Sequence, residues 1–264
     1  MLASLLDDVV QRFDGSGVLA IALMGSHARG NAGPLSDVDI VRFTDEASSK
    51  LAGSGSHLLS GHLMVVSNVS PADVAKWFSQ PEVAVGVIAG VRQAQVLLDR
   101  DSYFASIQIR AHDFTWTVEM QERANRWASQ QLVGWVEEVH KGLAGVQSGD
   151  VGRLLNGRHG LSWGLSHVMQ VHRGVLLSGD NGFYDEVAQA MGPQSEWVQL
   201  RRMAFGIEGE DGVVPTLREQ VLAGLRLYVV TAELLASVLH ADDVLLITHT
   251  IKLIRETLKG RKDG

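Results

Sequence analysis

The chain has 264 residues, no cysteine, 45% hydrophobic and 20% charged residues, and a formal net charge of -7. Without cysteine it can form no disulfide framework, thiolate metal site or cysteine nucleophile, and its apolar content is too high for a disordered chain. The longest apolar runs, 18–24 and 83–91, are much shorter than the roughly 20 residues that a membrane helix needs. The N-terminus carries Asp7 and Asp8 where a signal peptide carries basic residues, so we expect a cytoplasmic protein without membrane association.

Charge is spread evenly and gives no sign of a nucleic-acid partner. Residues 1–112 contain 8 Lys and Arg against 11 Asp and Glu, and residues 113–264 contain 15 against 19. A protein that holds nucleic acid by its phosphates needs clustered cations. We therefore do not expect a polynucleotide substrate.

The first 112 residues alternate between helical and strand patterns. Apolar residues at helical spacing open the chain, and short apolar or alternating runs bounded by glycine follow, which favours an α/β (α+β) domain with a small sheet. The expected elements are a helix over 1–13, strands over 18–24 and 37–43, a surface loop over 45–56, a third strand region over 57–68, a capped helix from Ser70, and a last strand within 86–98.

From about Thr117 onward, the 3.6-residue period dominates. Long apolar stripes are separated by turn signals such as Gly149-Asp150, Gly192-Pro193 and the cluster 178–182. This pattern predicts an all-α helical bundle. We expect two domains, 1–112 and 113–264.

The stretch GSHARGNAGPLSDVDI, residues 25–40, combines two features that suit phosphate and metal chemistry. Gly25 and Ser26 follow a predicted strand, where glycine lets a phosphate approach and free amides and the Ser26 hydroxyl can bind its oxygens. Asp37 and Asp39 are two residues apart on the next strand, so both carboxylates point to one face. Such a pair is unfavourable at the edge of a core unless a cation neutralises it, and oxygen ligands suit Mg²⁺.

This stretch resembles the signature of the nucleotidyltransferase superfamily that includes DNA polymerase beta, namely a strand, Gly-Ser, a spacer, and Asp-x-Asp or Asp-x-Glu. Residues 94–101, AQVLLDRD, also resemble the element where the last strand leaves the catalytic domain of small antibiotic nucleotidyltransferases. The helical second half matches the general layout of that group. The kanamycin and lincosamide enzymes are the kind of member that the chain resembles most.

The resemblance implies roles for individual residues. Asp37 and Asp39 would bind Mg²⁺ and, through it, a nucleoside triphosphate, while Gly25 and Ser26 would hold its β- and γ-phosphates with help from Arg29. An acceptor hydroxyl would attack the α-phosphorus and pyrophosphate would leave. The resemblance further implies transfer of AMP from ATP to a small molecule such as an aminoglycoside or lincosamide. This acceptor would bind between the two domains, and the enzyme would be a homodimer.

One residue of the family pattern is missing. The superfamily usually supplies a third carboxylate from the strand after Asp-x-Asp, as a metal ligand or base, but the strand here reads SGHLMVVSN. His62 lies about where the acid would be, and histidine can act as a base near neutral pH. Asp99 and Asp101 are alternatives, and so are Glu137 and Glu138, because kanamycin-type enzymes take the base from a helix of the second domain. The sequence does not choose among these five.

Two other functions stay open at this point. One is an antitoxin-type adenylyltransferase that modifies a partner protein, although such proteins are typically small single domains and this chain has a long helical half. The other is a catalytically inactive module that binds a nucleotide or an antibiotic, which the missing third acid suggests.

Overall fold

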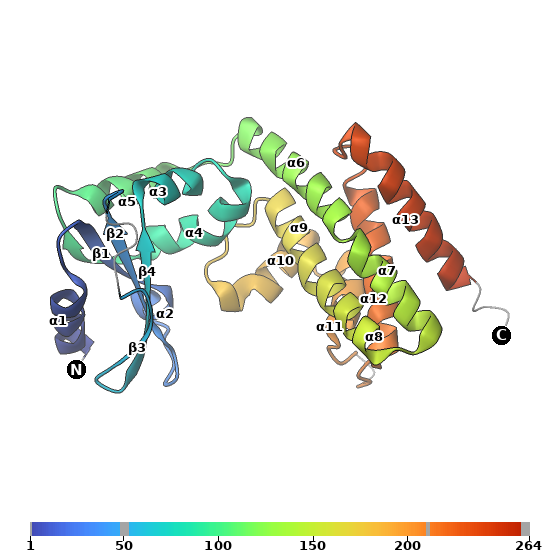
Figure 1. Cartoon of the computed structure of the whole chain (residues 1–264), viewed down its shortest axis with the longest axis horizontal. Coiled ribbons are helices and arrows are strands. Elements are labelled where there is room, and N and C mark those ends of the chain that lie inside the picture. The colour runs from blue at the N-terminus through green and yellow to red at the C-terminus, as the bar shows by residue number, and fades with distance from the viewer. Residues whose placement is uncertain (1, 48–52, 210–211, 260–264) are drawn as a thin grey trace. The chain divides into compact units, whose positions relative to one another are not determined.

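The computed structural model describes residues 2–47, 53–209 and 212–259 (Figure 1). It divides into two compact units, an N-terminal unit of Met1–Thr117 with Leu176–Phe183, and a helical unit of Val118–Val175 with Tyr184–Gly264. The division therefore falls just beyond the expected boundary at 112, and the short segment 176–183 belongs to the N-terminal unit. Among the described residues, none of the helices is both long and apolar enough to cross a membrane.

The N-terminal unit is built on a five-stranded mixed sheet with the strand order β3-β4-β2-β1-β5. The strands are β1 (Val18–Met24), β2 (Val38–Thr44), β3 (Gly55–Leu59), β4 (His62–Val69) and β5 (Gln95–Asp99). Strands β2 and β4 are parallel, and the other neighbouring pairs are antiparallel. The α+β fold class with a small mixed sheet is thus confirmed.

Helices cover both faces of this sheet (Figure 1). They are α1 (Leu2–Phe13), α2 (Gly25–Arg29), α3 (Pro71–Trp77), α4 (Pro81–Gln93) and α5 (Tyr103–Asp113). On one face, α1 buries Val9 and Phe13 against β1, β2 and β4. On the other, α3, α4 and α5 bury Trp77, Ile88 and Phe104. Apolar side chains on both faces fix the direction of each strand, and therefore the direction of every side chain at its ends.

Two sequence expectations for this unit were wrong. The region 57–68 is a hairpin of two strands, because Ser60 and Gly61 both have positive φ, as a two-residue type I′ turn requires. This hairpin begins at Gly55, inside the expected loop over 45–56, and residues 48–52 of that loop lie outside the described residues. Residues 86–93 are helical and complete α4, so the strand starts only at Gln95. A short apolar run fits a strand and a buried helix equally well by its periodicity.

The helical unit confirms the all-α expectation for the second half of the chain. Its elements are α6 (Val118–Gly134), α7 (Val136–Ser148), α8 (Val151–His159), a π-helical turn η1 (Gly160–Gly164), α9 (Leu165–His172), α10 (Phe183–Met191), α11 (Glu196–Phe205), α12 (Leu217–Leu234) and α13 (Ala241–Lys259). A short 3-10 turn η2 (Asp180–Gly182) lies in the segment 176–183, which is part of the N-terminal unit.

Asp99 has a structural role at the start of α5, where its carboxylate accepts the backbone N–H groups of Phe104 (2.8 Å) and Ala105 (3.0 Å). We expect Asp99→Ala to lower the free energy of unfolding by about 0.5–2 kcal/mol, because the helix loses its cap. Asp101→Asn is a matched control, since Asp101 is exposed and asparagine tolerates its positive φ. The control should change stability by no more than about 0.5 kcal/mol in urea denaturation. An equal loss in both variants would contradict the capping role.

Candidate active site

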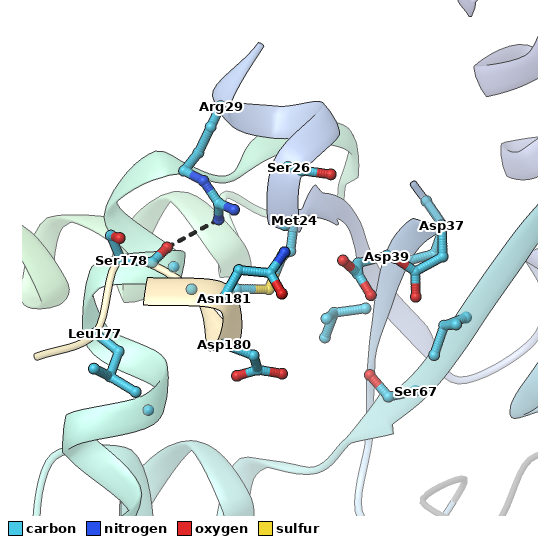
Figure 2. A pocket seen from close by; sticks show the side chains of 17 residues that line it. Met24, Ser26, Arg29, Asp37, Asp39, Ser67, Leu177, Ser178, Asp180 and Asn181 are labelled. Atoms are coloured by element: carbon cyan, nitrogen blue, oxygen red, sulfur yellow. Dashed lines mark hydrogen bonds between the residues drawn. The ribbon is translucent and has the colours of Figure 1, made fainter. Parts of the chain in front are cut away.

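A cavity of about 370 Å³ opens on the face of the sheet that α4 covers (Figure 2). All five residues that the motif singled out line it: Gly25, Ser26, Arg29, Asp37 and Asp39. The first three belong to α2, which follows β1 directly, whereas Asp37 immediately precedes β2 and Asp39 lies within it. The structure thus brings the two ends of the motif into one site.

Gly25 and Asp39 are in direct contact at the centre of this site. Met24 pairs with Asp39 in the antiparallel ladder of β1 and β2, so the chain passes the carboxylate as it leaves β1. Gly25 has a φ of 65°, and a Cβ built on it would lie only 1.9 Å from Oδ2 of Asp39. Residue 25 must therefore be glycine for two reasons, its left-handed backbone conformation and the lack of space for a side chain.

Asp39 is half-buried and surrounded by like charges. Its pKa is raised above the ordinary value, first by burial and then by the negative charges of Asp37 and Asp180, while Arg29 and His27 act in the opposite direction. Both burial and neighbouring carboxylates disfavour the ionised form. Without a bound cation, the site therefore has an excess of negative charge around Asp39.

The residues of the cavity fit a divalent cation of the Mg²⁺ type. Among the described residues, no three His, Asp or Glu side chains lie close enough together to ligate one metal ion by themselves. Mg²⁺ usually takes only one or two carboxylates and completes its shell with substrate phosphates and water. Asp37 and Asp39, which share the cavity and repel each other, suit that arrangement.

Strand β4, which lies beside Asp39, contributes no acidic residue to the cavity. Strand β4 runs parallel to β2 with Val65 opposite Asp39, and the residues of β4 that line the cavity are Val65 and Ser67. His62 is the first residue of β4 and does not line the cavity. It has the strand parity of Met64, which packs on the opposite face with α1. His62 therefore does not take the place of the family's third acid.

The third carboxylate at this cavity is Asp180, which the sequence reasoning missed. The segment 176–183 contributes Leu177, Ser178, Gly179, Asp180 and Asn181 to the lining, and Figure 2 shows Asp180 with Asp37 and Asp39 around the same space. The charge of Asp180 contributes to the raised pKa of Asp39, so the two groups interact electrostatically. The only sequence signal was the turn cluster 178–182, which interrupts the helical stripes.

Asp99 and Asp101, the other two sequence candidates for the base in the N-terminal unit, do not line the cavity. Asp99 caps α5, and Asp101 is exposed. Glu137 and Glu138 belong to α7 of the helical unit, where both form ion pairs of 2.8 Å with Lys141. Glu137 and Glu138 thus share one lysine, and their role as the base stays a prediction.

Part of the chain is similar to known proteins. Residues 2–98 match the family model of the nucleotidyltransferase domain, whereas no curated protein matches the chain significantly. One similar solved structure is the crystal structure of a nucleotidyltransferase-like protein from Exiguobacterium sibiricum 255-15, with 13% identity and a TM-score of 0.51. The match covers 90% of this chain and 75% of that chain, and at this identity it concerns the fold. The N-terminal part of the chain, residues 2–98, is thus similar to nucleotidyltransferase domains.

Proposed function

We propose that the chain transfers a nucleoside monophosphate, AMP from ATP, to a hydroxyl group of a small acceptor such as an aminoglycoside or lincosamide. The observation that carries this proposal is the contact of Asp39 with Gly25 in a cavity that also holds Asp37 and Ser26. This contact places the two carboxylates, which would bind a cation, next to the glycine backbone, which would bind a phosphate. The nature of the acceptor rests on the resemblance to small antibiotic nucleotidyltransferases.

Different residues of the cavity would have different roles in the reaction. Asp37 and Asp39 would hold Mg²⁺, which when bound neutralises phosphate charge and polarises the α-phosphorus. The Ser26 hydroxyl and the backbone at Gly25 would bind the triphosphate oxygens. The acceptor oxygen forms a bond to the α-phosphorus, the bond from that phosphorus to the bridging oxygen breaks, and pyrophosphate leaves.

Asp180 is the residue best suited to accept the proton of the acceptor hydroxyl. It is an exposed carboxylate of the cavity that belongs to neither β2 nor β4, so it remains available when Asp37 and Asp39 hold the cation. A general base must lie within reach of the reacting hydroxyl, at the cavity. With Asp180 the cavity has a third carboxylate, which supports catalysis over a module that only binds a nucleotide or an antibiotic.

A screen of nucleotides and acceptors tests the proposal directly. We expect MgATP, and not ATP with chelator, to raise the melting temperature, because a ligand at 100 times its Kd stabilises the folded state by about 2.7 kcal/mol. Asp37→Asn and Asp39→Asn should abolish this shift and lower pyrophosphate release by about a hundredfold or more. The absence of a shift with every nucleotide in Mg²⁺, or of pyrophosphate release with every acceptor of an antibiotic panel, would contradict the proposal.

A pair of glycine variants isolates the contact that carries the proposal. Gly25 and Gly30 both have positive φ, 65° and 75°, so alanine costs each about 1 kcal/mol in backbone strain. Only at Gly25 does the new Cβ displace Asp39, since Gly30 has no atom within 4 Å of that position. We expect Gly25→Ala to lose MgATP binding in calorimetric titration and Gly30→Ala to retain it. Equal affinities in the two variants would exclude a role for the contact.

Asp180→Asn tests the proposed base. We expect turnover to fall by about a hundredfold, the usual contribution of acid–base catalysis, while the affinity for MgATP stays the same or increases, because a negative charge is removed. The matched control is Asp101→Asn, which changes an exposed acid outside the cavity and should leave the turnover number unchanged. A turnover number within a few-fold of the unmodified protein would show that Asp180 is not the base.

A further inference from the structure

The segment 176–183 is held against the N-terminal unit by three kinds of contact. Leu176 packs on the apolar core between the sheet and α4. The backbone N–H of Leu177 donates to the carbonyl oxygen of Val85 in α4, at 2.8 Å. Arg29 donates from Nη1 to the carbonyl oxygen of Ser178, at 2.9 Å, which is the hydrogen bond drawn in Figure 2. The last of these joins the segment to the motif itself.

Gly179 gives the guanidinium of Arg29 the space to make this contact. Its backbone is extended, a conformation open to any residue, so the glycine is not needed for its φ. A Cβ on Gly179 would instead lie 2.9 Å from Nη2 and 3.2 Å from Cζ of Arg29. The guanidinium thus packs directly on the backbone at residue 179. The next residues form the turn η2, closed by a 2.9 Å bond from the N–H of Gly182 to the oxygen of Gly179.

Arg29 itself is fixed in direction by its own short helix. The backbone N–H of Asn31 donates to the oxygen of Ser26 (3.1 Å), and Gln95 of β5 donates to the oxygen of Ala28 (2.8 Å). Both bonds hold α2 at the end of β1. Arg29 therefore contacts residues 178 and 179 from a fixed position. These two residues immediately precede the turn η2, which begins with Asp180.

We propose that Arg29 is a positioning residue, which holds the segment Leu177–Asn181 at the cavity and through it fixes the carboxylate of Asp180. This differs from the phosphate-binding role that the sequence suggested, because the guanidinium is engaged with the segment. The positioning of the segment stands independently of the proposed function. Only its last step, the effect on proton transfer by Asp180, rests on that function.

Amide hydrogen exchange of the full-length protein tests the positioning without any substrate. In Arg29→Ala and in Gly179→Ala, which keeps the arginine but fills its space, the hydrogen-bonded amides of Leu177 and Gly182 should exchange about tenfold faster or more, because the segment opens locally. Arg29→Lys keeps the charge and one possible donor to Ser178, so it should restore part of the protection. Unchanged exchange in both alanine variants would overturn the proposal.

Matched controls separate this effect from general destabilisation. Arg12→Ala removes an exposed arginine of α1, and Gly15→Ala adds a methyl group at a position with no atom within 4 Å. Neither residue lines the cavity. Both controls should leave exchange of the segment as it is in the unmodified protein, and exchange of the β1 amides should be the same in all variants. Faster exchange throughout the N-terminal unit in Arg29→Ala would mean a general structural role and overturn the proposal.

Steady-state kinetics distinguish positioning from phosphate binding. In Arg29→Ala and Gly179→Ala, kcat for pyrophosphate release should fall about tenfold or more while KM for ATP stays within about threefold, because a misplaced group affects the chemical step. A raised KM with an unchanged kcat in Arg29→Ala alone would identify a phosphate ligand and overturn the proposal. If the unmodified protein released no pyrophosphate with any acceptor, the proposed function would fail, and hydrogen exchange would still decide the positioning.

Discussion

The carboxylate of Asp39 lies where any side chain at residue 25 would have to be, and the rest of the site follows from that close approach. Strands β1 and β2 are antiparallel neighbours, with Met24 opposite Asp39. The chain must therefore leave β1 beside the carboxylate and return to the same point at the start of β2. The intervening residues form α2 and a loop that ends at Asp37. The spacing between Gly-Ser and Asp-x-Asp is thus the length of chain that this return path requires.

Asp39 itself lies in an electrostatically unfavourable position. Asp39 is partly removed from water and lies near two other negative groups, Asp37 and Asp180, so its pKa is raised. A fold can hold such a group only when other interactions stabilise the strands that carry it. Here the apolar layers on both faces of the sheet do so, with Ile21, Ile40 and Ile88 fully buried. A bound cation would relieve the repulsion, which is the physical reason for the proposed metal site.

Sequence reasoning was accurate where the signal was local and failed where the contact was distant. Strand β1 could be predicted because its apolar run is bounded by glycines, and β2 because its residues alternate between apolar and polar. The positions of the motif residues at the ends of these strands follow from them. The β3–β4 hairpin could have been found from Ser60-Gly61, a common turn pair. The helical residues 86–93 could not be separated from a strand by periodicity alone. Asp180 carried no signal of its own, because nothing in the turn Asp180–Gly182 indicates which part of the chain it contacts.

Asp180 is far in sequence from the stretch 2–98, which explains why the sequence of that stretch lacked a third acid. The family model covers residues 2–98, and within them the strand after Asp-x-Asp offers valine and serine at the cavity. Judged from that stretch alone, the chain lacks a third acid and resembles a binding module. The compact unit is larger than the matched stretch, because it also includes Leu176–Phe183, and that segment brings a carboxylate to the cavity. The site must therefore be judged from the spatial unit, in which Arg29 of the motif donates a hydrogen bond to the segment that carries Asp180.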